Sequence, residues 1–367
     1  VHLISPMAAR AARIEHSRQQ QQRSLENDHA MKVVHWNISK QSHPMFATRR
    51  YEDELFKRLN ATIDGSVSRI FRRESKLFGN TISSWLTRYD SDNFDIVHAT
   101  FQTIAPAAYF SRPKNLIVTV HDILPTFPNT SHDISTKIQW KFTPSALKMA
   151  DAIIAISDFT RKELIKHLEV DPQLIHVVPQ GVDHSLFKPL DKIDSRKQLG
   201  LDPESLYVLV ASSNQTHKRM DLAKDILLEL RSRNPHVKLL KIGYGDSLQM
   251  DGVINLGWIP ENKMPLLYNS ADVYLHTSDY EGFGLPILEA MACGTPAIAN
   301  NRASIPEVIG PANTINMNSI SPSKICDHIF EKMELDIDQP ALDRSKTFTW
   351  DQTASGTLDI YKEVLEN

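Results

Sequence analysis

Residues 278–296, SDYEGFGLPILEAMACGTP, give the clearest indication of the fold. They follow an apolar run of strand length at 272–276, place two glycines in a short loop, and begin a helix with Pro286 in its first turn. The helix is expected to end at Gly294. A strand, a glycine loop and a helix in this order form a βα unit, whose unpaired N–H groups at 284–287 favour the binding of a phosphate.

The same alternation of strands and helices extends outward over the chain from Met31 and is typical of parallel α/β sheets. A first series of strands is predicted at 31–36, 95–99, 116–120, 152–156 and 174–178, and a second at 206–211, 237–242, 252–256, 272–276 and 296–299. Helices are predicted at 158–169, after a Ser157/Asp158 cap signal, and at 220–232. Each series therefore predicts its own doubly wound sheet.

The length of 367 residues predicts two domains. The polar segment 183–204 carries no strand pattern, so we expect the hinge there, between a domain at 31–185 and a domain at 186–345. Residues 1–30 show no core pattern and Met31 precedes the first strand, so we expect the natural start at Met31, with a leader that is translated upstream sequence or a disordered tail.

Composition excludes several classes of protein. A formal net charge of −3, from 41 Lys and Arg against 44 Asp and Glu, offers no global positive field for nucleic acid. The two cysteines, Cys293 and Cys326, have no CxxC spacing, so neither a disulfide framework nor a zinc site is suggested. Without a signal-peptide pattern or a run of 18 apolar residues, we expect a cytoplasmic protein.

Two glutamates flank the predicted phosphate site. Glu281 precedes the helix and Glu289 lies within it, so the two carboxylates can meet opposite ends of one ligand. A carboxylate that accepts two hydrogen bonds suits the vicinal diol of a ribose. A Glu-x7-Glu pair alone occurs by chance about once per chain of this size. The glycine loop and the helix boundaries around it make the pattern more specific, and it suggests a nucleoside diphosphate that carries a hydroxylated group.

The string EGFGLPILEAMACGTP, from Glu281 to Pro296, followed by SIPEVIG at 304–310, closely resembles the EX7E region of the family 4 retaining glycosyltransferases. The resemblance covers nearly everything from Met31 onward and implies the GT-B fold, in which two Rossmann-like doubly wound domains face a cleft. It further implies that 31–185 is an acceptor domain, that 186–345 is a nucleotide-sugar donor domain, and that 346–367 forms a helix packing back toward the first domain.

The resemblance also implies roles for individual residues. Glu281 would contact the donor sugar, Glu289 the ribose, and Lys218 the diphosphate, whose growing negative charge a cation stabilises. His121 would touch the donor sugar, with Asp122 orienting it. The implied catalytic residues are thus His121, Lys218 and Glu281. The implied donor-binding residues are Ser213, Arg219, Gly243, Gly245, Gly282, Phe283, Gly284, Leu285 and Glu289, and the implied acceptor-side residues are Arg50 and Tyr51.

Three of these residues also have an ordinary structural interpretation that involves no ligand. His121 could be a buried structural histidine, Lys218 a solvated residue at a helix start, and Glu289 a solvated helix carboxylate.

The sequence departs from the family pattern in two places. An arginine that usually precedes the diphosphate-binding lysine is missing from 211–213, which leaves Arg219 or His217 as substitutes. The glycines that usually precede the acceptor-side helix are replaced around Ala47, so the identity of the acceptor cannot be carried over.

No metal centre is expected. The pairs Asp90/Asp92 and Asp336/Asp338 spell D-x-D, but neither follows a strand end in the cleft, and we interpret both as solvated. Between Arg69 and Arg88, apolar and basic residues recur at helical spacing. This stretch could lie on an anionic membrane and collect a lipid-linked acceptor at the inner face, although such a stripe more often packs on its own sheet.

The sequence thus predicts a retaining, metal-independent hexosyltransferase without a cofactor, acting in glycan, polysaccharide or glycolipid synthesis. GDP-mannose and UDP-glucose are the donors considered, and a saccharide or lipid-linked molecule is the acceptor. A nucleotide-sugar epimerase of the same fold and a nucleotide-sugar-binding protein without turnover remain alternatives. A dinucleotide-dependent oxidoreductase is disfavoured, because no G-x-G-x-x-G follows the first strand of either half.

Overall fold

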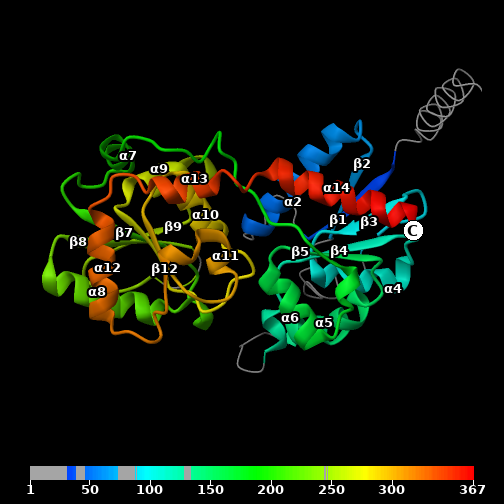
Figure 1. The fold of residues 1–367 in the computed structure, drawn as a ribbon, viewed down its shortest axis with the longest axis horizontal. Helices are drawn as coiled ribbons and strands as arrows, with labels where there is room; N and C mark the ends of the chain where they lie inside the picture. The colour runs from blue at the N-terminus through cyan, green and yellow to red at the C-terminus, as the bar shows by residue number, and fades with distance from the viewer. Residues whose placement is uncertain are drawn as a thin grey trace, which may run out of the picture.

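The computed structural model describes residues 31–38, 46–72, 87, 89–127, 134–243, 245 and 247–367. Two parallel six-stranded sheets, each flanked by helices, stand side by side as two lobes (Figure 1). The predicted pair of doubly wound sheets is therefore confirmed.

The first sheet has the strand order β2-β1-β3-β4-β5-β6 and the second β12-β11-β10-β7-β8-β9. The strands of the first sheet are β1 (Val33–Asn37), β2 (Val67–Phe71), β3 (Ile96–Ala99), β4 (Leu116–Val120), β5 (Ala152–Ala155) and β6 (Ile175–Val177). Those of the second are β7 (Leu206–Ala211), β8 (Val237–Ile242), β9 (Val253–Gly257), β10 (Val273–His276), β11 (Ala297–Asn300) and β12 (Thr314–Ile315).

The helices of the first domain are α2 (Phe46–Thr62), α4 (Ala108–Ser111), α5 (Ile134–Leu147) and α6 (Asp158–Leu168). Those that follow are α7 (Lys192–Leu199), α8 (Met220–Arg233), α9 (Met264–Ser270), α10 (Leu285–Ala292), α11 (Ile305–Ile309), α12 (Pro322–Met333), α13 (Gln339–Ser345) and α14 (Trp350–Glu366). Helices α6 and α8 agree with the predicted ranges, and Ser157 caps α6 by accepting a hydrogen bond from the Thr160 N–H.

The ten predicted strands are present with small shifts at their ends, but two further strands were not predicted. β2 covers residues that were assigned to a helically spaced stripe at 69–88, so that interpretation is wrong for 69–71. There the chain is extended and pairs with β1, in the register Val33 to Val67. Residues 73–86 and Arg88 lie outside the described part of the chain. β12 has two residues and gives no strand pattern of its own.

Helix α7 lies inside the segment predicted as the hinge and packs against α9 of the second lobe. Arg196 of α7 pairs with Asp272 at 2.7 Å, and both side chains are buried. Helix α14 begins with a capping box formed by Thr349 and Gln352 and crosses to pack against α2 of the first domain, as the resemblance implied (Figure 1).

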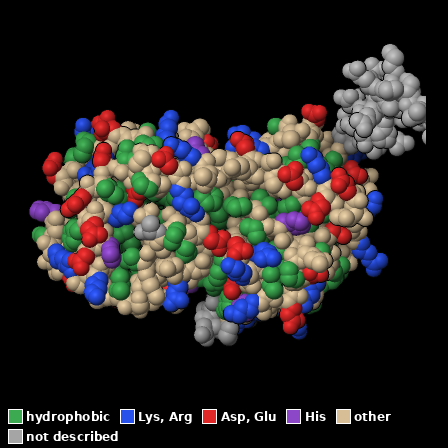
Figure 2. Space-filling view, in the orientation of Figure 1, with side chains coloured by type: hydrophobic (Ala, Val, Ile, Leu, Met, Phe, Trp, Pro, Cys, Tyr) green, Lys and Arg blue, Asp and Glu red, His purple; other side chains and the backbone are tan. Residues whose placement is uncertain are grey.

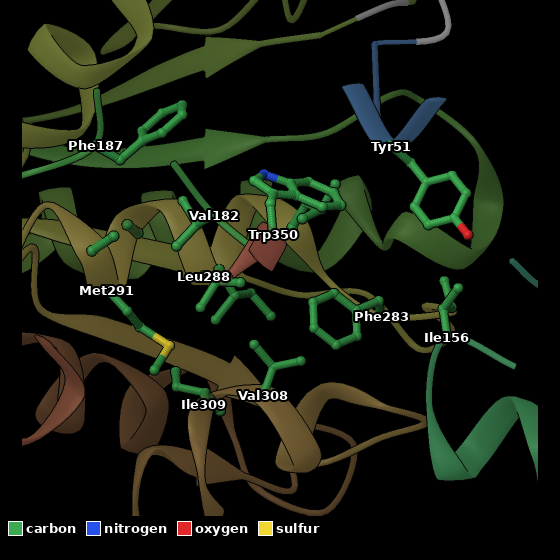
Figure 3. Close-up of a cluster of buried hydrophobic side chains, with 14 of the residues drawn as sticks. Tyr51, Ile156, Val182, Phe187, Phe283, Leu288, Met291, Val308, Ile309 and Trp350 are labelled. Carbon is green, nitrogen blue, oxygen red and sulfur yellow. The ribbon is translucent and has the colours of Figure 1, made fainter. Parts of the chain in front are cut away.

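A continuous hydrophobic cluster joins the two lobes. Trp350 lies between Tyr51 of the first domain and the side chains of α10, with Val182 and Phe187 of the connecting segment beside it (Figure 3). Because apolar surface from both lobes is buried together, the lobes are held near one another at this end.

Charged side chains of both signs are interspersed over the visible face, as expected for a net charge of −3 (Figure 2). None of the helices in the described ranges combines the length and hydropathy needed to span a bilayer.

Candidate functional site

The site lies where the order of the second sheet reverses. In this sheet β7 lies between β8 and β10. The loops that follow the carboxyl ends of β7 and β10 therefore separate from each other, as at the ligand sites of open α/β sheets. The loop after β7 carries Lys218 and the loop after β10 carries Glu281. The Lys218 carbonyl accepts a hydrogen bond from the Thr277 hydroxyl at 2.8 Å, which ties the two loops together.

Lys218 and Glu281 form an ion pair. The Lys218 Nζ lies 2.7 Å and 2.8 Å from the two carboxylate oxygens, and the side chains are 20% and 14% exposed. His276 Nε2 lies 2.9 Å from Glu281 Oε1. Burial alone would raise the pKa of Glu281, but the charge of Lys218 and the contact with His276 hold it well below its usual range. Glu281 is therefore an ionised carboxylate held against a cation.

A first cavity of about 510 Å³ opens beside this pair, and its volume suits a small molecule. It is lined by Ala47, Arg50, Ala211, Ser212, Ser213, Lys218, Ile242, Gly243, Gly245, Gly257, Trp258, Ile259, Glu261, Met264, Tyr268, Leu285, Pro286 and Glu289. Five of the residues implied for donor binding, Ser213, Gly243, Gly245, Leu285 and Glu289, thus meet at one cavity.

The N-terminus of α10 faces this cavity through Leu285 and Pro286. Gly284 caps the helix with φ near +111°, a left-handed conformation that glycine adopts without strain. The expectation of unpaired N–H groups across 284–287 holds only in part, because Pro286 has no N–H and the Ile287 N–H donates to the Gly284 carbonyl at 3.0 Å. Leu285 lies at the positive end of the helix dipole. This part of the cavity is suited to bind an anion.

Glu289 lies deeper in the cavity and is 4% exposed. Its Oε2 accepts a hydrogen bond from the Tyr268 hydroxyl at 2.7 Å, and its Oε1 contacts the Arg50 guanidinium. Arg50 also donates to Glu261 at 2.7 Å. Arg50 was expected on the acceptor side, but it reaches across from α2 and places its charge in the first cavity, opposite Glu289.

Several other predicted residues lie away from the cavities. Tyr51 is fully buried, and its hydroxyl bonds to Thr119, so it does not face an acceptor. Phe283 packs in the core against Phe348 because its ring points inward from the loop (Figure 3). Arg219, considered as a substitute for the missing arginine, turns outward to pair with Asp221 and Asp279.

His121 lies at the seam between the domains, but both nitrogens of its ring are occupied. Nε2 lies 3.0 Å from the Thr100 carbonyl, and Nδ1 lies 3.2 Å from the Gln180 amide nitrogen. Nε2 therefore donates and Nδ1 accepts, which makes the ring neutral. Burial lowers the pKa of His121 to about 4, against a smaller raising effect of the Thr100 bond. Asp122 does not orient the ring as expected, since its carboxylate accepts from the Leu124 N–H.

Gly282 makes the closest approach across the seam. A Cβ on it would lie 1.8 Å from the His121 carbonyl oxygen, so only glycine fits without a backbone shift. The Gly282 carbonyl accepts a hydrogen bond from Ser157 at 2.7 Å, and the buried Ser304 hydroxyl donates to the carbonyls of Glu281 and Phe283. The loop that carries Glu281 is thus held from both domains.

A second contact also links the two domains. The N–H groups of Asp158 and Phe159, at the start of α6, donate to the two oxygens of Glu307 at 2.8 Å and 2.7 Å. The carboxylate of one domain therefore caps a helix of the other.

A second cavity, of about 430 Å³, is lined by both members of the Lys218–Glu281 pair. It is lined by Ile38, Arg72, Phe101, Gln102, Thr103, Asp122, Leu124, Pro125, Thr136, Gln139, Trp140, Gln215, His217, Lys218, Tyr280, Glu281 and Gly282. Lys218 lines both cavities, so a molecule in either one can approach the same cation.

Among the residues of the first cavity that sequence reasoning missed are Trp258, Glu261 and Tyr268. Trp258 directly follows β9 and is 60% exposed, a position from which an indole can stack on a flat ring. Its place after a strand end, in the run Gly257-Trp-Ile-Pro260, was the available signal.

Of the two D-x-D pairs, Asp90 and Asp92 are exposed as expected. The interpretation of Asp338 as solvated is wrong, because it is 3% exposed, caps α13 and pairs with Lys332. Its carboxylate is used to begin a helix.

The two halves of the chain match known families separately. Residues 33–186 match the family described as Glycosyltransferase Family 4, and residues 191–329 match Glycosyl transferases group 1. Among curated relatives, the O-antigen chain mannosyltransferase B of Escherichia coli is 28% identical over 68% of this chain and 71% of its own. A D-inositol 3-phosphate glycosyltransferase of Segniliparus rotundus is 30% identical over 59% of this chain, which spans about half (53%) of that relative's length.

Two solved structures share the fold at low sequence identity. Anabaena HepE in complex with UDP and glucose is 18% identical with a TM-score of 0.68, over 90% of this chain and 99% of its own. A sucrose-phosphate synthase from Thermosynechococcus elongatus is 17% identical with a TM-score of 0.72, over 92% and 99% of the respective chains.

Proposed function

The chain belongs to glycosyltransferase family 4, and from this premise we propose that it transfers a hexose from a nucleotide sugar to an acceptor hydroxyl with retention of the anomeric configuration. The observation that carries the proposal is the Lys218–Glu281 pair, because Lys218 lines both cavities and Glu281 lines the second. The first cavity would hold the nucleoside diphosphate, with the sugar directed at the pair, and the second cavity, which Glu281 also lines, would admit the acceptor.

The first cavity offers a partner for each part of a nucleoside diphosphate. Glu289, fixed by Tyr268, can accept hydrogen bonds from the two ribose hydroxyls. The indole of Trp258 can stack on the base, and the N-terminus of α10 faces the diphosphate. These three groups would place the anomeric carbon of the sugar next to Lys218 and Glu281.

In the reaction, the bond between the anomeric carbon and the β-phosphate oxygen breaks, and the acceptor oxygen bonds to the same face of the sugar. The leaving diphosphate gains negative charge, which Lys218 and the positive end of the α10 dipole stabilise. The sugar gains positive charge, which the ionised Glu281 carboxylate stabilises. The acceptor proton passes to the leaving phosphate. Because the positive charge comes from the chain, we propose that no metal ion is required.

The donor is proposed to be GDP-mannose or UDP-glucose. The Escherichia coli relative is named a mannosyltransferase, which supports the first, and Anabaena HepE binds UDP and glucose, which supports the second. The second cavity supports transfer over epimerisation, because an epimerase of this fold would bind the donor but needs no site for an acceptor.

The proposal predicts metal-independent turnover. Release of nucleoside diphosphate is measured from UDP-, GDP- and ADP-sugars in EDTA, with and without simple glycosides and a lipid extract. We expect release from one donor to increase when an acceptor is added, and the rate to be the same when magnesium replaces EDTA. Binding of a nucleotide sugar without release under any acceptor would favour a binding protein, and activity only with a divalent cation would contradict metal independence.

A further inference from the structure

We propose that Arg50 of the first domain is a donor-binding residue, whose guanidinium passes from Glu289 to the diphosphate when a nucleotide enters the first cavity. This inference rests on the proposed transfer reaction and gives a donor-side role to a residue that was expected on the acceptor side. It makes the binding of the donor depend on a side chain of the opposite domain.

Arg50 spans the boundary between the domains. It lies on α2 and lines the first cavity together with Ala47 of the same helix. Its Nε donates to Glu261 at 2.7 Å and its Nη1 contacts Glu289, and both glutamates belong to the second domain. The guanidinium lies 5.3 Å from the centre of the Phe187 ring, and the side chain is 14% exposed. Arg50 therefore brings a positive charge from the first domain into this cavity.

The contact with Glu289 occupies a carboxylate that the nucleotide needs. Oε2 of Glu289 accepts a hydrogen bond from the Tyr268 hydroxyl, and Oε1 is the partner of Arg50. The ribose diol brings two further donors to the same carboxylate. Because Glu289 is 4% exposed, the ribose has to approach it through the cavity that Arg50 lines. A bound ribose therefore takes the place of the guanidinium on Oε1.

The charge of the lining gives the released guanidinium a second partner. Among the described residues around the first cavity, Arg50 and Lys218 are basic, and Glu261 and Glu289 are acidic. These charges cancel, and Lys218 is also held by both oxygens of Glu281. An entering diphosphate brings negative charge without a surplus of positive charge to meet it. Arg50 becomes available to it when the ribose binds Glu289.

The guanidinium has a short distance to cover. Glu289 lies four residues after Leu285 on α10, which is about 6 Å along the helix axis. Leu285 is at the positive end of the helix dipole, in the part of the cavity suited to an anion. Rotation about the side-chain bonds of an arginine covers a distance of this size without movement of α2.

The chemistry of arginine suits such an exchange. Its planar fork of N–H donors fits carboxylates and phosphates alike, and its charge-assisted hydrogen bonds are stronger than neutral ones. After the exchange the carboxylate of Glu289 is bonded to the ribose and Arg50 to the phosphate, so neither group is left buried without a partner. Glu261 is 55% exposed, and water can replace Arg50 there.

The test separates the nucleoside from its phosphates. Dissociation constants of UDP and uridine, and of GDP and guanosine, are measured by calorimetry on the chain of 367 residues, and the base whose diphosphate binds is used. Arg50→Gln removes the charge and keeps an amide that can donate to Glu289. We expect the Kd of the diphosphate to rise about 10-fold, while the Kd of the nucleoside stays within about threefold of the wild-type value.

Two further variants complete the test. Glu261→Gln changes an exposed side chain and releases one partner of Arg50, so we expect the diphosphate to bind about threefold more tightly and the nucleoside to bind unchanged. The matched control is Arg49→Met, on the same helix, which pairs with Asp53, does not line the cavity and should change neither Kd.

An Arg50→Gln protein that keeps the wild-type preference for the diphosphate overturns the inference, and so does an equal loss of nucleoside and diphosphate binding. If Arg50→Gln does not fold, an unchanged preference in Glu261→Gln overturns it. Failure of the wild type to bind either diphosphate would overturn the proposed function and this inference with it. Binding of a diphosphate without transfer to any acceptor would contradict only the transfer reaction, so the two failures are distinguishable.

Discussion

Replacing Lys218 by methionine should lower kcat by about 100-fold or more. The substitution removes the cation that faces both cavities and that lies 2.7 Å from Glu281. The leaving diphosphate then loses a charged partner in the transition state, while the contact of Glu281 with His276 remains. The pKa of Glu281 should therefore rise toward its usual range, because the largest lowering influence on it is gone.

The measurement is the rate of acceptor-dependent nucleotide release, together with the thermal unfolding midpoint. Lys224→Met, on the exposed side of α8, is the matched control and should retain full activity. Because Lys218 and Glu281 act as one pair, the double variant Lys218→Met/Glu281→Gln should cost about as much as the worse single variant. Wild-type rates in both single variants would remove this pair from the reaction.

Replacing Gly282 by alanine should have the second largest effect. Its Cβ would lie 1.8 Å from the His121 carbonyl oxygen. The backbone fixes the position of a Cβ and the oxygen is itself a backbone atom, so neither can rotate away. The loop that carries Glu281 must therefore move away from the first domain, which also stretches the 2.7 Å bond from Ser157. A displacement of about 1 Å at a catalytic group can cost about 100-fold in rate.

We expect Gly282→Ala to lose about 100-fold in kcat for transfer, whereas binding of the nucleoside diphosphate, measured by calorimetry, should change much less. Gly282 lines the second cavity and not the first, so the donor site is left largely intact. Gly356→Ala is the control, because a Cβ there meets its nearest neighbour at 3.4 Å, an ordinary contact. Full activity of Gly282→Ala would show that catalysis does not depend on the close contact of Gly282 with the first domain.

The βα units could be predicted because each short apolar run is followed by a helix with its own cap, as at Ser157 and α6. Lys218 and Glu281 were assigned to one site through the family resemblance. Their ion pair, between residues 63 apart, depends on β7 and β10 being neighbours in the sheet, an order that the strand pattern of the sequence does not give. β2 was missed because the basic and apolar residues that continue beyond it mimic a helical stripe.

The position of Arg50 could not be predicted, because its partners Glu261 and Glu289 are 211 and 239 residues away in another domain. Tyr51 and Phe283 show a related limit. Each stands beside a residue of the site, but its ring turns into the core, and neither spacing nor composition indicates that direction.

The anomeric configuration of the product tests the account most directly. The donor selected in the release assay carries an α-linked sugar, and its transfer to a methyl glycoside is followed by proton NMR in the presence of EDTA. The account predicts an α-linked product, formed by wild type and lost in Lys218→Met. A β-linked product would contradict a reaction in which the acceptor attacks the face that the diphosphate leaves.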